Sequence, residues 1–432
     1  MSNCEFCKHN IFTLPCKSSI AVKKGFSLLA YAPLTGKVFL CSQSALKRIE
    51  QKIITSEQQK LLEKFYPDGI CNNIPSLPIH PDNYSRLTII PSHACNFSCS
   101  YCYAAQGHSP LRISRLHLKY GLEYFLRPNR TNKHLKIMIT GGGEPLTAWE
   151  EIKYLLQYAN ELAVRNQYNI YCTLMTNGGL LDENKILFLK QHNVHICVSF
   201  DITEFAQNHS RQNYKQVCEA ITLSTAMGAS VSCSATVTPD TVEEIPQMIS
   251  VMQTTFPLIR NVSIEPVTAN DGFVSAEKAK VFYDRFQYLF LQYCEPCEIP
   301  QISCTILDFM QRQTSRCCPG KLCLTPQGTF SICHCVSSPQ ETRYADSIYG
   351  FISDDGKCIF DIQKYTTLIL QGTNTEPQCQ NCFAKYNCAG MCLTRQDCYS
   401  PEIQKVYCDF VRNFMQQKLE NYCLENLELC LN

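Results

Sequence analysis

The middle of the chain alternates short apolar segments with longer segments of helical periodicity. In the longer segments, apolar residues recur every three or four positions, as in AWEEIKYLLQYANELA. Strands alternating with helices predict a parallel sheet, and strands that are apolar throughout predict burial on both faces. Six strands are too few for an eight-fold closed barrel, so we expect an α/β fold with a partial, open-sided (β/α)6 barrel. The strand candidates are 87–91, 136–140, 170–176, 195–201, 230–238 and 261–267.

The segment before this region has a different pattern. IAVKKGFSLLAYAPLTGKVFLCS contains two β-like runs joined by a turn, and SALKRIEQKI and SEQQKLLEKFY are helical patterns. The stretch 67–83 is rich in Pro, Asn and Asp, which is typical of a linker. We therefore expect a small α+β N-terminal module with its linker at 1–83 and the barrel at 84–272.

The pattern changes again after the barrel. Residues 273–316 are expected to form a helical bridge, and 409–432 a C-terminal helix. Between them, residues 317–408 show little periodicity and are dense in cysteine and loop residues. A region of this kind seldom builds an apolar core, so we expect metal or covalent links to stabilise it.

Composition excludes some classes of partner. The 432 residues are 45% hydrophobic and 18% charged, which is typical of a globular protein. Lys plus Arg number 39 and Asp plus Glu 38, so no net field attracts nucleic acid or an anionic membrane. The N-terminus has no apolar signal segment, and no run reaches the roughly 18 apolar residues of a membrane span. We expect a cytoplasmic chain that binds neither nucleic acid nor a membrane.

The chain contains 29 cysteines. Thiols stay reduced in the cytoplasm, so many cysteines there favour metal or cluster binding over disulfides. Several lie in apolar patterns and are expected to be small core residues: Cys172, Cys197, Cys218 and Cys233. Near the N-terminus, Cys4 and Cys7 form a zinc site with Cys16 in one interpretation and an exposed tail in the other.

The stretch CNFSCSYC places Cys95, Cys99 and Cys102 directly after the first expected barrel strand. Thiolates are soft ligands that suit iron–sulfur clusters, and a cubane cluster is saturated by four of them. Three thiolates therefore leave one iron open to a substrate or cofactor. The alternative is a zinc site that a distant His or Cys completes.

The stretch TGGGEP places Gly142, Gly143 and Glu144 after the second expected strand. Glycines let the backbone approach a ligand closely, and a carboxylate there can hold an ammonium group, although a plain tight turn is the alternative. Because parallel strands end at the same edge of a sheet, this turn and the cysteine loop are expected to face one cavity.

Together these motifs resemble those of the radical S-adenosylmethionine (SAM) family, including the aromatic Tyr101 before the last cysteine. The resemblance implies a 4Fe–4S cluster with SAM on its open iron. Reductive cleavage of SAM then yields methionine and a 5′-deoxyadenosyl radical, which abstracts a substrate hydrogen, while the protein positions the reactants. The implied cofactor-binding residues are Tyr101, Gly142, Gly143, Glu144, Ser199 and Arg211, with Asn177 and Asp201 as neighbours.

The cysteine-rich segment carries a CxxCxxxxxCxxxC run and resembles the SPASM extension of radical SAM maturases, which holds two auxiliary 4Fe–4S clusters. Two zinc ribbons are the alternative. By the resemblance, one cluster is bound by Cys379, Cys382, Cys388 and Cys408. The other is bound by Cys317 or Cys318, Cys323, Cys333 or Cys335, and Cys392.

Proteins with a SPASM extension mostly modify peptides or proteins. The resemblance therefore implies a ribosomally made precursor peptide as substrate, crosslinked through a carbon–carbon or thioether bond, and a low-potential electron donor of the flavodoxin or ferredoxin type. The N-terminal module resembles the precursor-binding (RRE-like) modules of such maturases, where an extended leader peptide adds to an edge strand. A plain N-terminal cap on the barrel is the alternative.

Two other functions compete with peptide crosslinking. Anaerobic sulfatase maturases, which form formylglycine, carry an Asp directly after the cysteine of GxxxxC, where this chain has His334. Histidine can also accept a proton, which makes His334 a candidate catalytic residue. A non-catalytic iron–sulfur or zinc protein, binding a partner or carrying electrons, is an alternative of another class. Such a protein needs neither Glu144 nor an open iron.

Overall fold

The computed structural model describes residues 12–50, 56, 77, 80–267, 275–306, 313–371, 377–390, 392, 399–426 and 429–431. Cys4, Cys7, the helix expected over 57–66 and most of the expected linker lie outside these ranges. Within the described ranges, no helix combines the length and apolar character needed to cross a membrane.

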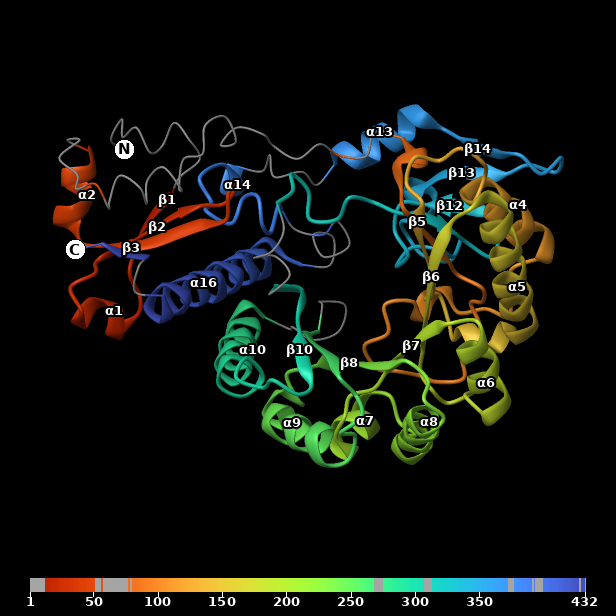
Figure 1. The fold of residues 1–432 in the computed structure, drawn as a ribbon, viewed down its shortest axis with the longest axis horizontal. Helices are drawn as coiled ribbons and strands as arrows, with labels where there is room; N and C mark the ends of the chain where they lie inside the picture. The colour runs from red at the N-terminus through yellow and green to blue at the C-terminus, as the bar shows by residue number, and fades with distance from the viewer. Residues whose placement is uncertain are drawn as a thin grey trace.

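A curved sheet of eleven strands forms the centre of the molecule, in the order β10-β9-β8-β7-β6-β5-β4-β11-β12-β13-β14 (Figure 1). The six strands expected from the sequence are β4 to β9, all paired in parallel, so the predicted α/β fold is confirmed. Their bounds are β4 (Arg86–Ile89), β5 (His134–Ile139), β6 (Asn169–Thr176), β7 (Val194–Ser199), β8 (Val231–Val237) and β9 (Asn261–Pro266).

Helices cover the outer face of this parallel sheet (Figure 1). In α5, the residues Ile152, Leu155, Leu156 and Ala159 are at most 1% exposed, at the helical spacing that the sequence pattern showed. Each large apolar side chain buried in this way contributes about 1.5–3 kcal/mol. The helices are α4 (Arg115–Phe125), α5 (Trp149–Asn166), α6 (Glu183–Gln191), α7 (Glu204–Ser210), α8 (Tyr214–Ala226) and α9 (Ile245–Thr254).

Short strands extend the sheet at both ends. On one side β10 (Gln301–Ser303) pairs in parallel with β9, within the segment expected to be a helical bridge. On the other side β11 (Leu322–Leu324) pairs in parallel with β4, which attaches the cysteine-rich segment to the barrel. Strands of three residues are too short to show periodicity in a sequence. The remaining elements of the cysteine-rich segment are β12 (Thr329–Ser331), α12 (Tyr344–Ser347), β13 (Ile348–Ile352), β14 (Cys358–Phe360), α13 (Ile362–Leu370) and α14 (Pro377–Gln380).

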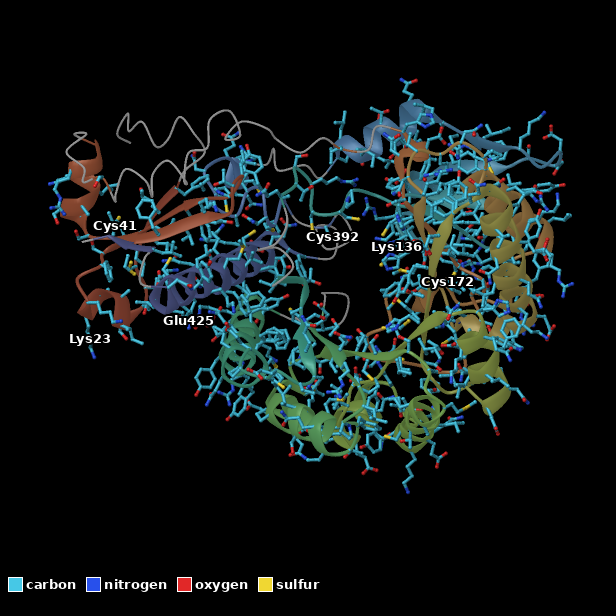
Figure 2. All side chains as sticks on the ribbon, viewed as in Figure 1. Lys23, Cys41, Lys136, Cys172, Cys392 and Glu425 are labelled. Atoms are coloured by element: carbon cyan, nitrogen blue, oxygen red, sulfur yellow. The ribbon has the colours of Figure 1, made fainter. Side chains whose placement is uncertain are left out.

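A second, four-stranded sheet has the order β1-β2-β3-β15 and joins the two ends of the chain. The strands β2 and β3 form the expected hairpin, whereas residues 19–23 form a helix whose N-cap, Ser18, accepts a hydrogen bond from the Ala21 amide. Cys41 on β3 and Glu425 at the end of α16 lie in this part of the molecule (Figure 2). The elements are β1 (Phe12–Pro15), α1 (Ser19–Lys23), β2 (Leu28–Ala32), β3 (Lys37–Cys41), α2 (Gln43–Glu50), α16 (Pro401–Glu425) and β15 (Cys430–Leu431).

The long helix α16 fastens the N-terminal sheet to the rest of the protein. The carboxylate of Glu420, fully buried, accepts hydrogen bonds from the amides of Lys17 (2.9 Å) and Ser18 (2.6 Å). On its other side α16 packs against α10 (Ala276–Leu289), where the rings of Tyr283 and Phe410 stack with centroids 4.6 Å apart. The helix therefore connects the N-terminal module to α10, in the segment that follows the barrel.

Candidate active site

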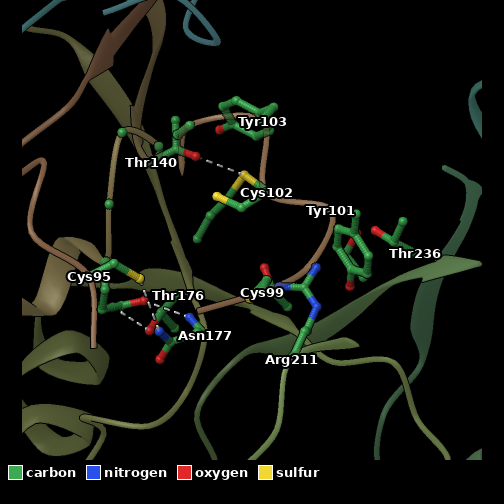
Figure 3. A pocket seen from close by; sticks show the side chains of 18 of the residues that line it. Cys95, Cys99, Tyr101, Cys102, Tyr103, Thr140, Thr176, Asn177, Arg211 and Thr236 are labelled. Atoms are coloured by element: carbon green, nitrogen blue, oxygen red, sulfur yellow. Dashed lines mark hydrogen bonds between the residues drawn. The ribbon is translucent and has the colours of Figure 1, made fainter. Parts of the chain in front are cut away.

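A cavity of about 370 Å³ lies at the C-terminal ends of the parallel strands (Figure 3). This is the edge where ligands bind in parallel α/β sheets. The cavity is lined by most of the residues expected from the sequence: Cys95, Cys99, Tyr101, Cys102, Gly142, Gly143, Glu144, Asn177, Ser199 and Arg211. Asp201 is fully buried behind the wall, next to Arg211.

The loop after β4 presents three thiols to the cavity, from Cys95, Cys99 and Cys102. The loop is held to the barrel by a hydrogen bond from the Ser100 amide to the Ser210 carbonyl (2.9 Å). Burial raises the pKa of Cys99 to about 11, although the nearby Arg211 guanidinium lowers it. Three half-buried thiols around one cavity fit an iron–sulfur cluster with three protein ligands.

The glycines of the TGGGEP turn are required by close packing against this loop. A Cβ atom on Gly143 would lie 2.3 Å from the carbonyl oxygen of Ala94, just before Cys95. Gly142 has a φ of +78°, a conformation that favours glycine, and a Cβ there would lie 2.8 Å from the Cδ2 of His93. The turn and the cysteine loop are therefore in direct contact.

The Glu144 carboxylate is 2% exposed and is held by donors from the protein. Its oxygens accept hydrogen bonds from the Asn177 amide (2.7 Å), the Thr176 hydroxyl (2.7 Å) and the Leu146 amide (3.0 Å). Burial raises its pKa, while these hydrogen bonds act in the opposite direction. Glu144 therefore ties the turn to the end of β6. An ammonium group bound by this carboxylate would share its oxygens with the three protein donors.

Asn177 connects the cysteine loop to the end of β6. Its side-chain amide donates to the Asn96 side-chain oxygen (2.9 Å) and lies 4.0 Å from the Cys95 sulfur. Its oxygen accepts from the Gly179 amide (2.9 Å). The TNGG segment thus orients the first thiol as well as lining the cavity.

Arg211 lies on the opposite wall, below Cys99 and Tyr101 (Figure 3). Its Nε donates to Asp201 (3.3 Å), and its guanidinium lies 5.1 Å from the centre of the Tyr101 ring. Asp201 also accepts hydrogen bonds from the Tyr101 hydroxyl and from the Thr236 amide (2.9 Å). Burial lowers the pKa of Arg211, but Asp201, Tyr101 and Cys99 together raise it above its ordinary value. The wall thus carries a fixed positive charge beside the thiols.

Several lining residues were not anticipated from the sequence. Thr236 on β8 and Glu265 on β9 face the cavity, and the Nε2 of His108 lies 3.9 Å from the Cys102 sulfur. The signal for the strand residues was present, because Ser232, Ser234 and Thr236 alternate with apolar residues along β8. From the sequence, that segment is expected only to be a buried strand.

The cysteine-rich region gathers thiols into two groups. The first thiol group surrounds a small cavity lined by Cys379, Cys382, Cys388 and Cys408. Burial raises the pKa of Cys388 well above its ordinary value, and the neighbouring Cys317 raises it further, ahead of the other three. The structure therefore brings Cys317 to the first thiol group.

The second thiol group consists of Cys318, Cys323, Cys333, Cys335 and Cys392. Lys321 lies among them, with its Nζ 3.8 Å from the Cys318 sulfur. Burial lowers the pKa of Lys321, but the surrounding sulfurs outweigh burial and raise it. A hydrogen bond with Cys333 and burial both raise the pKa of Cys335.

His334 lies between the second thiol group and the first cavity. Its Nε2 is 3.6 Å from the Cys335 sulfur, and its ring meets the ring of Tyr103 edge-on with centroids 6.1 Å apart. Burial lowers the pKa of His334 to about 3, and the charges of Lys321 and Arg86 act in the same direction. The imidazole is therefore neutral near pH 7.

Comparison with known proteins identifies the barrel. Residues 89–252 match the model of the radical SAM superfamily. The chain is 29% identical over 136 residues to the radical SAM cyclopropyl synthase TigE of Paramaledivibacter caminithermalis, which covers 28% of each protein. It is 28% identical over 130 residues to the cysteine-type anaerobic sulfatase-maturating enzyme of Clostridium perfringens, covering 28% of this chain and 34% of that enzyme. The matched segments thus span a minor part of either relative.

Solved structures share the fold over most of the chain. The structure titled native anSMEcpe with bound AdoMet superposes with a TM-score of 0.61 at 16% identity, covering 78% of this chain and 99% of that one. Streptococcus suis SuiB bound to the precursor peptide SuiA gives a TM-score of 0.53 at 13% identity, covering 91% and 97%. The family match therefore identifies residues 89–252 as a radical SAM domain, and these solved structures share the fold around it.

Proposed function

We propose that this chain cleaves SAM reductively and modifies a ribosomally made peptide, forming a carbon–carbon or thioether crosslink within it. The observation that carries the proposal is the single cavity that combines three thiols on one loop, the glycine–glutamate turn and the buried Arg211–Asp201 pair. A 4Fe–4S cluster with SAM on its open iron supplies a 5′-deoxyadenosyl radical for hydrogen abstraction.

The residues of the chain have distinct parts in this proposal. Cys95, Cys99 and Cys102 hold the cluster, and the turn at Gly142 and Gly143 brings backbone close to the SAM methionine group. Glu144 and Asn177 fix the turn and the loop relative to each other.

The opposite wall of the cavity is proposed to bind SAM. Ser199 and Arg211 face the same cavity and are proposed to contact SAM, with Arg211 attracting its carboxylate. Asp201 and Tyr101 hold the guanidinium in place. Because these groups are fixed before SAM arrives, binding costs little reorganisation.

The two thiol groups are proposed to hold auxiliary clusters. The four cysteines around the small cavity of the first thiol group come from α14, the loop after it and α16. One shared metal centre would explain why they converge. The second thiol group lies beside β11 and is attached through it to β4, whose following loop carries the SAM cluster. Clusters at both places would bring the total to three.

A peptide substrate is supported by solved structures that share this fold and contain a bound peptide. SuiB was solved with the precursor peptide SuiA, and anSMEcpe with a peptide named Cp18Cys. Among the described residues, β1 is an edge strand of the N-terminal sheet, to which an extended peptide can add. We propose that the module at 1–83 binds the leader of the precursor there, and that a low-potential flavodoxin or ferredoxin supplies the electron.

The proposal is tested with the full chain reconstituted anaerobically with iron and sulfide. About twelve irons per chain, with 5′-deoxyadenosine formed from SAM and dithionite, is the expected result. A chain that holds zinc and forms no deoxyadenosine would be a binding protein, and the proposal would be wrong. Crosslinking removes two hydrogens from the peptide, whereas conversion of a cysteine to formylglycine removes its sulfur, so mass spectrometry separates these two reactions. Formylglycine made from serine also loses two hydrogens, and an aldehyde-specific label detects it.

A further inference from the structure

The second thiol group contains more ligand atoms than a cubane cluster uses. A cubane takes four thiolates, and this group has an additional thiol and the imidazole of His334. In the part of the chain that the structure describes, one set of three or more Cys, His, Asp or Glu side chains brings all its ligand atoms within 4.8 Å of one another. That set is Cys333, His334 and Cys335.

The imidazole of His334 is placed as a ligand would be. Its Nε2 is 3.6 Å from the Cys335 sulfur. Its Nδ1 is buried and has no hydrogen-bond partner among the described residues. A buried ring nitrogen without a partner is unfavourable, and a metal bond to Nδ1 itself would remove that cost.

The ring is confined by neighbours on the side of the first cavity. The ring of Tyr103 meets it edge-on, at an interplanar angle of 78°. A Cβ atom on Gly141 would lie 3.9 Å from the His334 Cδ2 and 3.6 Å from its carbonyl oxygen. His334 is therefore held between the glycine-rich turn and the thiols.

We propose that His334 is a nitrogen ligand of the metal centre in the second thiol group, which then has a mixed cysteine and histidine ligand set. The inference rests on the proposed function and refines it. Imidazole and thiolate are both ligands for iron and for zinc. A histidine bound to metal cannot serve as the proton acceptor that the sequence suggested, so this assignment replaces that role.

The ligand change has a consequence for the electronics of the centre. A neutral imidazole in place of an anionic thiolate makes an iron–sulfur centre less negative, and histidine ligation raises reduction potentials in known clusters. Because His334 contacts Gly141 and Tyr103, the altered ligand lies on the side of the centre that faces the SAM cavity.

Pulsed electron paramagnetic resonance on the reduced full chain tests the proposal, using histidine labelled with heavy nitrogen and no added SAM. We expect a nitrogen coupling that changes with the label, disappears in His334→Ala and persists in His117→Ala. His117 is a matched control because it contacts Pro326 in the same region and lies outside both thiol groups. The His334→Ala centre should also shift to a more negative potential.

X-ray absorption spectroscopy distinguishes iron from zinc in the second thiol group. If the centre is zinc, its absorption edge should show sulfur and nitrogen neighbours, with the nitrogen lost in His334→Ala. A fully loaded centre with only sulfur neighbours and no histidine coupling would overturn the proposal. Should His334→Ala fail to fold, His334→Gln serves as the second variant for the loss of the histidine coupling.

Failure of the histidine assignment can be distinguished from failure of the proposed function. Failure of the proposed function appears as absent iron at the first cavity and no 5′-deoxyadenosine. Failure of the histidine assignment appears as normal deoxyadenosine formation together with an all-sulfur centre.

Discussion

The cavity at the strand ends and the cysteine-rich region collect their thiols in opposite ways. Cys95, Cys99 and Cys102 lie on one short loop after a buried strand, fixed by contacts with the adjacent strand ends. The two thiol groups draw cysteines from segments between 317 and 408, which are separated by short strands and helices. One site is local in sequence and supported by a large core, and the others are assembled across the chain.

The difference shows what holds each region together. The barrel buries continuous apolar strands between helices, so its thiols are presented by an already stable scaffold. The cysteine-rich region has three-residue strands and brief helices, so metal binding is expected to contribute to its folding. Removing one thiol should therefore abolish chemistry in the first region and disturb structure in the second.

The largest expected effect is at the barrel. In Cys99→Ala we expect no detectable 5′-deoxyadenosine, because a cluster with two protein ligands is not retained at the open cavity. The iron content should fall by about four per chain, with the helical content unchanged by circular dichroism. Cys172→Ala, in the core of β6, is the control and should retain turnover. Normal turnover in Cys99→Ala would refute the assignment of the loop.

The second effect concerns the first thiol group. In Cys388→Ala we expect about four fewer irons and a lower melting temperature, while SAM cleavage remains measurable because the barrel is intact. The modified peptide should be lost. If Cys388→Ala modified its peptide fully, the auxiliary centre would be dispensable and the contrast between the two regions would fail.

The third effect concerns the carboxylate that joins the turn to β6. Glu144→Gln should lower the free energy of unfolding by about 2–3 kcal/mol, because the new amide group faces buried donors that need an acceptor. It should also weaken SAM binding. Glu150→Gln, on an exposed side chain of α5 that pairs with Lys153, should change stability by less than about 0.5 kcal/mol. Chemical denaturation of the anaerobic chain measures both.

The fourth effect is a pH dependence from His93, which lies under the glycine-rich turn. Burial lowers its pKa from 6.5 to about 4. The unfolded chain therefore takes up this proton more readily than the folded one, and stability falls as the pH drops from 6.5 towards 4. Between pH 7 and pH 5 the loss should be about 2 kcal/mol. His93→Gln should remove that slope, and an unchanged slope would show that another group is responsible.

The smallest effect tests the contact between the N-terminal module and the first thiol group. The buried Tyr31 hydroxyl donates to the Asn387 side chain (3.0 Å), next to Cys388. Tyr31→Phe should lower the free energy of unfolding by about 1 kcal/mol, while Tyr288→Phe, on the exposed face of α10, should have no effect. Identical melting curves for all three proteins would mean that the module is not coupled to this region through Tyr31.

Much of the barrel could be predicted because its signals are local. In the run 195–201, β7 buries every second residue against the helices, and the loop at Cys95 lies where a parallel strand must end. The residues missed on β8 and β9, such as Thr236 and Glu265, differ in one respect. They line the cavity because the sheet curves around it. The alternation along β8 marks a polar face, but it does not show what that face encloses.

The sequence by itself determined the parallel α/β core, the three-thiol loop and the glycine–glutamate turn, because strand burial and close backbone contact each demand particular residue types at fixed spacing. Only the tertiary structure decided which thiols meet. Cys317 and Cys318 are neighbours in the chain, yet the first lies with Cys388 and the second beside Lys321. Adjacent side chains point in different directions, and which surroundings each one reaches depends on how distant segments pack around them.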